Sequence, residues 1–359
     1  MTTLWMRYVK FERVKNILHI VSEQDNLLTV SALEREIRQR EIFADEGKST
    51  VGHSTLYHYR KVMENLGLLR LSDRRYHVSD QTMVRAFLSS TAIDTSLSEN
   101  EQAKELLRKI IVTNADCQDN YFDMFMDHSG YSFEQFKEFG KPVGVRILTD
   151  KKVINGKRSG IVRSARTNLF ANKPEDVFDL EKLETEKKKT EKVNQVEFLP
   201  CHREAVTLES YVKVNGIFWG IRLWANDLGI TDELISPTDS NLRIIYPVKN
   251  FEPKIMKKCL LDYIDQSRDG EEWVYIYIPQ LIEDLAKKYG WSVAAITSFL
   301  RSFIDRNRAL AFAVPTSSRF TDFQTPFMSR RQVMRQQYLI YNNTLFSHIA
   351  LNKGLKRIE

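Results

Sequence analysis

Cysteine is scarce in this 359-residue chain, which contains only three. Cys117, Cys201 and Cys259 are odd in number and far apart, so they fit neither a disulfide framework nor a paired zinc knuckle. A reducing compartment is therefore expected. The chain also has no apolar run of membrane-spanning length, and its charged start, MTTLWMRYVKFERVK, is unlike a secretory leader. We expect no association with a membrane.

Short catalytic motifs are missing as well. The sequence has no glycine-rich phosphate loop, no H-E-x-x-H pair and no G-x-S-x-G elbow. Its seven histidines are scattered, and the adjacent Cys201 and His202 cannot build a metal site alone. We therefore predict no cofactor, no metal site and no catalytic residue. One short motif leaves an alternative open, since Asp150-Lys151-Lys152 follows an apolar stretch as in some Mg²⁺-dependent nucleases.

The excess of positive charge is small overall, with 53 Lys and Arg against 47 Asp and Glu, but it is unevenly distributed. Residues 137–173 hold ten basic side chains against two acidic ones, and residues 301–359 hold ten against three. Residues 98–136 reverse the sign, with three basic side chains against eight acidic ones. Separate basic and acidic blocks are typical of a protein that turns some faces toward phosphate and others toward itself or a protein partner.

The first 80 residues follow the order helix, short strand, helix, turn, helix and hairpin. Val14, Ile17, Leu18 and Val21 recur at helical spacing, and Ser31 with Glu34 three residues later resembles a capping box at the start of a second helix. A third helix spans the stretch STLYHYRKVMENLGLL and ends at a glycine, before two short strands around a polar tip.

The remaining chain divides by pattern. The stretch VGVRIL at 143–148 predicts a strand, and the Asn-Gly pairs at 155–156 and 215–216 predict hairpin turns, the second with a strand over 217–224. The predicted fold is α+β, with two winged-helix modules flanking a helical connector and a central β-rich domain. Its domains are 1–80 (winged helix 1), 81–140 (connector), 141–250 (central domain, with a charged loop at 172–195) and 251–359 (winged helix 2).

The C-terminal module carries the sharpest local match. Ala286, Gly290 and Ile296 have the spacing of helix-turn-helix units, in which alanine permits close helix contact and glycine takes the positive φ of the turn. Strands are expected in the stretches ALAFAV and QQYLIY, on either side of a long wing over 315–337. Both ends of the chain resemble the winged helix-turn-helix DNA-binding superfamily over roughly fifty residues each.

This resemblance implies that the third helix of each module lies in the major groove and that the wing touches the phosphate backbone. In the first module, the expected contacts are Ser54, Tyr57, His58, Arg60, Lys61 and Asn65 on the helix and Arg74 and Arg75 on the wing. In the second module they are Arg301, Arg319, Arg330, Arg331 and Arg335, although Asp305 on the same helix face would repel phosphate. A basic hairpin with Lys151, Lys152, Lys157 and Arg158 is a further candidate.

We therefore predict binding of double-stranded DNA without catalysis, by a cytoplasmic, nucleoid-associated protein. It would act as a transcriptional regulator or as the DNA-recognition component of a mobile-element or phage-defence complex. As a regulator, the central domain would sense a ligand or form a homodimer. Two alternatives remain: a Mg²⁺-dependent nuclease with winged-helix recognition arms, and an assembly subunit whose winged helices, the C-terminal one above all, bind protein.

Overall fold

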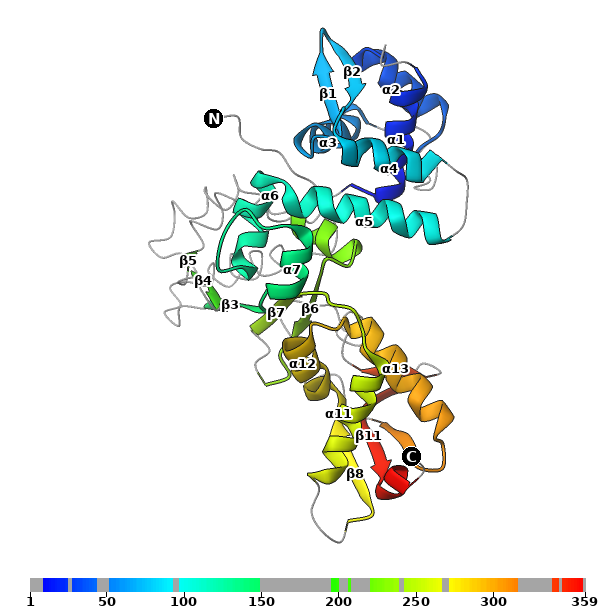
Figure 1. The fold of residues 1–359 in the computed structure, drawn as a ribbon, viewed down its shortest axis with the longest axis vertical. Coiled ribbons are helices and arrows are strands. Elements are labelled where there is room, and N and C mark those ends of the chain that lie inside the picture. Colours follow the sequence, from blue (N-terminus) through cyan, green and yellow to red (C-terminus); the bar gives the residue numbers. More distant parts are fainter. Residues whose placement is uncertain are drawn as a thin grey trace, which may run out of the picture. The chain divides into compact units, whose positions relative to one another are not determined.

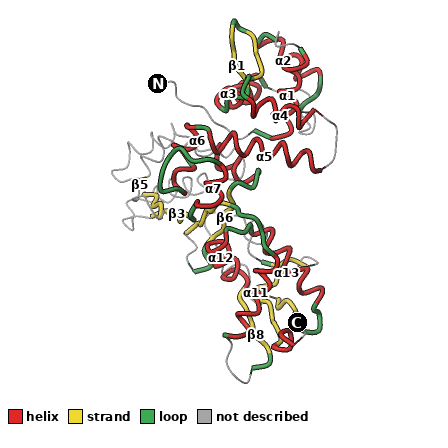
Figure 2. The backbone as a smooth tube through the Cα atoms, viewed as in Figure 1, coloured by secondary structure: helices red, strands yellow, loops and turns green. Residues whose placement is uncertain are grey.

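The computed structural model shows a mixed α+β protein with several small antiparallel sheets (Figures 1 and 2). It describes residues 9–24, 28–43, 52–92, 97–148, 195–199, 206–207, 220–238, 242–266, 271–315, 338–341 and 344–357. These residues divide into two compact units. The first unit takes in the described residues up to Phe136 together with 220–230, and the second takes in those from Lys137 to 209 and from Thr231 onward.

The N-terminal elements have the order that the sequence predicts. They are α1 (Phe11–Glu23), α2 (Val30–Gln39), α3 (His53–Asn65), β1 (Leu69–Ser72) and β2 (Arg75–Val78). β1 and β2 form an antiparallel hairpin, and the predicted short strand before α2 is a single bridge between Thr29 and Arg75. The backbone N–H of Tyr76 also donates to the carbonyl oxygen of Leu28, at 2.8 Å. The hairpin is thus tied to the segment that precedes α2.

Burial follows the predicted periodicity in these helices. Val14, Ile17, Leu18 and Val21 on α1 are fully buried, as are Leu56 and Met63 on α3. The start of α2 differs from the prediction, because Thr29 is its N-cap and accepts a hydrogen bond from the backbone N–H of Ala32. Glu34, expected to complete a capping box with Ser31, is instead buried. Its carboxylate pairs with α3, as described below.

Helices continue to residue 139, as predicted for the connector. They are α4 (Thr82–Ala92), α5 (Leu97–Thr113), α6 (Ala115–Asn120), the 3₁₀ turn η2 (Phe122–Phe125) and α7 (Phe133–Phe139). Tyr121, Phe122, Phe125 and Phe136 pack edge to face, with ring centroids 5.1–5.7 Å apart. This aromatic cluster forms the core around η2.

Residues 220–227 are helical, so the prediction of a strand over 217–224 is wrong for the described part of that stretch. Every residue from 220 to 225 is buried, so burial in this helix shows no single face. A short apolar run does not distinguish a buried helix from a strand. The two Asn-Gly pairs, at 155–156 and 215–216, lie outside the described residues.

The central sheet belongs to the second unit. Its strands β3 (Val143–Leu148), β4 (Gln195–Leu199), β5 (Val206–Thr207), β6 (Thr231–Ile235) and β7 (Leu242–Pro247) are in the order β5-β4-β3-β7-β6. Every neighbouring pair is antiparallel. The predicted strand at 143–148 is confirmed and lies at the centre of this sheet.

The C-terminal elements repeat the helix–strand alternation. They are α11 (Pro253–Asp265), β8 (Trp273–Tyr277), α12 (Ile278–Tyr289), α13 (Val293–Arg306), β9 (Ala311–Pro315), β10 (Leu339–Tyr341), β11 (Thr344–Asn352) and the 3₁₀ turn η5 (Lys353–Arg357). β11 pairs with β8, β9 and β10, so β9 and β10 do not pair with each other. β11 is not predicted from sequence, although its buried Leu345, Ser347 and Ile349 alternate.

The predicted contact between α12 and α13 has the expected residues. Ala286 and Ile296 are fully buried, and Gly290 ends α12 with φ 68°. The hydroxyl of Ser292 then caps α13 by accepting from the backbone N–H of Ala295, at 3.2 Å. A Cβ at Gly290 would lie 2.8 Å from the carbonyl oxygen of Pro247, at the end of β7. Glycine is required here by both the backbone conformation and the close approach.

We predict that Gly290→Ala destabilises the second unit more than a positive φ alone explains. The φ strain costs about 1–2 kcal/mol, and the clash with the Pro247 carbonyl adds about 1–3 kcal/mol. Gly229→Ala is the matched control, since φ is +66° there and nothing lies within 4 Å of the added Cβ. Urea unfolding would measure both variants, and an equal loss in the two would show that the close approach at Gly290 is unimportant.

Candidate nucleic-acid interface

The outward face of α3 is polar. Ser54 is exposed, Tyr57 is 41% exposed and the side chain of Lys61 is 37% exposed. His58 and Asn65 are partly exposed on the same side of the helix. These five positions follow helical spacing along one stripe, opposite the buried stripe that contains Leu56, Tyr59 and Met63. The structure therefore brings together five of the six predicted contacts on this helix.

Arg60 is the sixth predicted contact, and its placement on the outward face is wrong. Its side chain points into the module and is only 8% exposed. One terminal nitrogen lies 3.1 Å from Glu34 Oε1, and the other donates to the hydroxyl of Tyr76 at 2.9 Å. With both partners inside the module, Arg60 supports α3 from within.

Glu34 and Arg60 belong to a larger buried network that joins α2, α3 and β2. The Tyr76 hydroxyl, which accepts from Arg60, itself donates to Glu64 Oε1 at 2.8 Å. The other carboxylate oxygen of Glu64 pairs with the ammonium of Lys61, at 2.5 Å. The network thus reaches from a carboxylate on α2, through the hairpin, to a cation on the outward face of α3.

This supporting network is not predicted from sequence. The sequence predicts a cap for Glu34 and only two short strands for the stretch that contains Tyr76. The available signal was the position of Glu34 between Leu33 and Ile37, both buried, because an acid on the apolar face of a helix requires a buried partner. Several arginines in the sequence could be the buried partner of Glu34, and the sequence alone does not show which one it is.

The tip of the hairpin is a two-residue turn made by Asp73 and Arg74. Both have positive φ, 49° and 61°, as in the type I′ turns that favour Asn-Gly. Neither residue is glycine, and αL geometry costs an ordinary L-residue about 1–2 kcal/mol. Arg74 and its neighbour Arg75 are both exposed. A long cation therefore occupies a position where backbone energy alone would favour glycine.

Burial changes the acidity of Tyr76. The residue is 1% exposed, and desolvation together with its hydrogen bond to Glu64 raises its pKa to about 12. The positive charge of Arg60 acts in the opposite direction and is outweighed. The phenol therefore stays protonated throughout the neutral range, and it can donate to Glu64 while it accepts from Arg60.

On α13, the predicted contact Arg301 is exposed. The nearby Asp305 pairs with Arg308 at 3.2 Å, and both side chains are exposed. The start of this helix is held from β6, because Asp232 Oδ2 accepts from the backbone N–H of Val293 at 2.9 Å. Burial raises the pKa of Asp232. The outward face of α13 thus carries charges of both signs.

The other predicted contacts lie outside the described residues. They are Lys151, Lys152, Lys157, Arg158, Arg319, Arg330, Arg331 and Arg335. Asp150, on which the nuclease alternative depends, also lies outside them. Within the described part of the chain, no group of three or more His, Cys, Asp or Glu side chains is placed to hold a metal ion.

A search of protein-family models, curated proteins and solved structures finds no match to this chain. Among the described residues, none of the helices is both long enough and apolar enough to span a membrane.

We predict that Tyr76→Phe lowers the free energy of unfolding at neutral pH by about 1–3 kcal/mol, because Arg60 and Glu64 lose a buried partner. The raised pKa means that deprotonation favours the unfolded chain, so the contribution of Tyr76 is complete below pH 10 and is lost as the pH approaches 12. The difference between wild type and Tyr76→Phe should therefore shrink across this window. Urea titrations at several pH values would measure it.

Tyr57→Phe is the control for this experiment, since Tyr57 is exposed on the same helix and its loss should change stability by less than about 0.5 kcal/mol. A constant difference between wild type and Tyr76→Phe from pH 9 to pH 12 would contradict the proposed network.

We also predict that Arg74→Gly stabilises the N-terminal unit by about 1 kcal/mol, because glycine relieves the positive φ at the turn. Arg75→Gly is the matched control. It removes the same charge at the first residue of β2, where glycine weakens a strand, so it should destabilise the unit. Thermal unfolding of both variants would test this. A lower melting temperature for Arg74→Gly than for wild type would show that the positive φ at Arg74 does not strain the turn.

Proposed function

We propose that this chain binds double-stranded DNA through an N-terminal winged helix-turn-helix module, with α3 as its recognition helix. The main observation in support of this proposal is the polar stripe on α3. It is exposed beside a hairpin whose tip contains the exposed Arg74 and Arg75. The order of elements from α1 to β2, with the bridge between Thr29 and Arg75, supports the assignment. The protein would act as a transcriptional regulator or as the DNA-recognition component of a larger complex, such as a mobile-element or phage-defence assembly.

In this proposal α3 enters the major groove. Ser54 and His58 carry hydrogen-bonding groups suited to base edges, and Tyr57 has a large exposed ring with a hydroxyl at its end. Tyr57 is flanked by the Arg60 guanidinium, 5.8 Å from its ring centroid, and by the edge-to-face ring of His58 at 5.9 Å. These neighbours restrict the position of the tyrosine. A side chain held in this way loses little conformational entropy on binding.

The hairpin would contact the phosphate backbone. Arg74 and Arg75 are exposed cations at the tip, and backbone contacts by such residues set the register of a module without reading sequence. The buried network gives these contacts a fixed geometry, because Tyr76 on β2 is joined to Arg60 and Glu64 on α3. Helix and wing would therefore approach DNA as one rigid surface.

For the C-terminal elements we propose a second winged helix that binds protein. The outer face of its sheet carries Trp273, Tyr275 and Phe312, of which Tyr275 is 60% exposed and Phe312 is 40% exposed. Both of these residues are register partners of Ala350 on β11, so they flank one position of the central strand. Exposed aromatic clusters of this kind are typical of protein interfaces. The mixed charges on the outward face of α13 also favour this role over DNA contact.

We predict that the chain binds random duplex DNA and that Arg74→Gln and Arg75→Gln each weaken this binding several-fold. Each lost phosphate contact should reduce the slope of log K against log salt by about 1. Arg85→Gln is the matched control. It removes an exposed arginine from α4, outside the proposed surface, and should leave the affinity unchanged. Fluorescence anisotropy at several salt concentrations would measure all three variants.

Absence of binding at low salt would refute the DNA-binding proposal. Equal losses in Arg85→Gln and Arg74→Gln would instead show that binding depends on overall charge and not on this module.

A further inference from the structure

His53, the first residue of α3, is not among the DNA contacts predicted from the sequence. Its side chain is 73% exposed, yet one of its ring nitrogens, Nδ1, lies 3.0 Å from Glu34 Oε2 on α2. The side chain of Glu34 is only 9% exposed. A histidine on the surface is thus attached through one nitrogen to a buried carboxylate.

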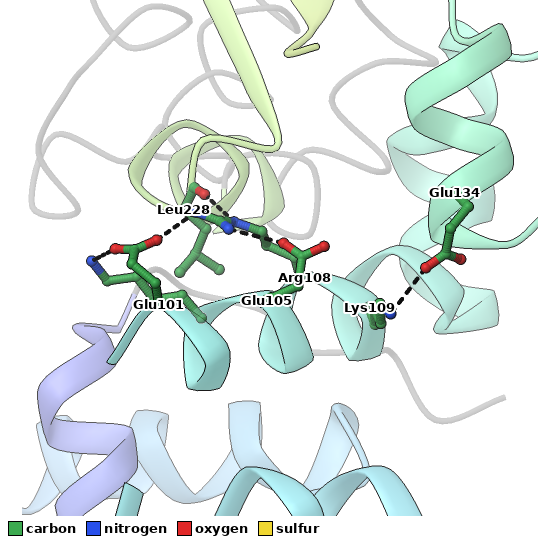
Figure 3. A network of polar contacts seen from close by, with 7 residues as sticks. Glu101, Glu105, Arg108, Lys109, Glu134 and Leu228 are labelled. Carbon is green, nitrogen blue, oxygen red and sulfur yellow. Dashed lines mark hydrogen bonds and ion pairs between the residues drawn. The ribbon is translucent and has the colours of Figure 1, made fainter. Parts of the chain in front are cut away.

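This pair differs from the ion pairs along α5, which lie in the acidic block at 98–136 (Figure 3). There Lys109 pairs with Glu134 at 3.0 Å, and the acid is the more exposed member. The other ion pairs drawn in Figure 3 have the same order of exposure. Between His53 and Glu34 the order is reversed, so the exposed member is the one that can carry a positive charge.

The position of His53 on α3 places its ring at the edge of the polar stripe. Tyr57 follows one helical turn later and is 41% exposed. Arg60 follows two turns later on the same side of the helix, which is why both Arg60 and His53 reach the carboxylate of Glu34. The ring therefore extends the proposed DNA-binding surface toward the start of α3.

The hydrogen bond to Glu34 determines what the other ring nitrogen, Nε2, can do. A carboxylate only accepts, so Nδ1 is the donor in this bond, and the neutral ring then has an acceptor at Nε2. Phosphate oxygens are acceptors as well. The protonated ring keeps its bond to Glu34 and gains an N–H at Nε2. Only the protonated form of His53 can therefore donate to a DNA phosphate.

The charges around the ring act in opposite directions. The carboxylate of Glu34 favours a charged ring, but Arg60, 3.1 Å from the same carboxylate, offsets this effect. Arg38, one turn after Glu34 on α2, adds an exposed cation, and the positive end of the α3 dipole also opposes a charge at the first helical residue. β2 contributes the neutral hydroxyl of Tyr76. A phosphate next to the ring would shift this balance toward the charged form.

We propose that His53 contacts a DNA phosphate and takes up a proton when it does so, with Glu34 as its positioning residue. The Nε2–H of the protonated ring donates to a phosphate oxygen, while Glu34 holds Nδ1. The inference rests on the proposed function and deepens it, because it makes DNA affinity depend on pH. Histidine changes its charge between about pH 5 and 8, so affinity should fall as the pH rises through this range.

The test measures the affinity of the full chain for random duplex DNA at about pH 6 and pH 8, by fluorescence anisotropy at several salt concentrations. Compared with wild type, His53→Gln should bind several-fold more weakly at the lower pH and equally well at the higher pH. The slope of log K against log salt should be smaller by about 1 at the lower pH only, because one phosphate contact is lost there.

His128→Gln is the matched control. It removes another exposed histidine of the first unit, in the loop before α7 and outside the proposed surface, so both affinities should stay as in wild type. His53→Arg is the converse variant. Its guanidinium is charged at both pH values, so it should bind DNA more tightly than wild type at the higher pH.

Glu34→Gln tests the positioning role. Without the carboxylate the ring loses both its fixed orientation and the charge that favours protonation, so binding should weaken at the lower pH and stay unchanged at the higher pH. A role for Glu34 in stability alone would weaken binding at both pH values. If this variant does not fold, His53→Gln and His53→Arg still decide the proposal.

The role of His53 is refuted if His53→Gln differs from wild type by the same factor at both pH values. It is also refuted if His128→Gln changes the pH dependence as much as His53→Gln does. The proposed function fails separately. Wild type that does not bind duplex DNA at either pH overturns both proposals, whereas binding that Arg74→Gln weakens and His53→Gln leaves unchanged overturns only the role of His53.

Discussion

The buried carboxylate of Glu34 is the constraint on which the N-terminal module depends. An isolated charge in a protein interior is strongly unfavourable, so the carboxylate requires a fixed cation, and Arg60 supplies it at 3.1 Å. Removing one member of such a pair costs about 3–5 kcal/mol. Arg60 also donates to Tyr76 on the hairpin. The need of the Glu34 carboxylate for a cation therefore links the position of α3 to that of the hairpin. An apolar core alone would leave their relative angle less defined.

The polar surface proposed to contact DNA follows from this arrangement. Arg60 is turned inward, which leaves Ser54, Tyr57 and Lys61 as the outward residues of α3, while Tyr76 anchors the strand next to the exposed Arg74 and Arg75. In the second unit, a different interaction positions two helices relative to each other. There Gly290 allows the turn between α12 and α13 to approach the Pro247 carbonyl closely. Close backbone approach at this turn, together with the hydrogen bond from Val293 to Asp232, positions the start of α13.

Most helices and the β3 strand could be predicted because their signals are local. Val14, Ile17 and Leu18 mark the buried face of α1 at helical spacing, and Ala286, Gly290 and Ile296 mark the contact between α12 and α13 and the turn that joins them. Residues 220–227 could not be assigned correctly, because a run of apolar residues satisfies helix and strand equally and only its neighbours decide. β11 was missed for a related reason, since two of its three partner strands, β8 and β9, are distant in the chain.

The sequence by itself determined which helix faces are apolar, where the turn between α12 and α13 lies and which stretches carry excess positive charge, since these depend on the order of neighbouring residues. Tertiary structure decided which charged side chains are buried. Arg60 and Lys61 are adjacent in sequence and equally basic, yet one is in the core and the other is partly exposed. That difference depends on where Glu34 and Tyr76 are brought by folding, because the energy of a charge is set by its distance from partners and water, and neither distance is encoded locally.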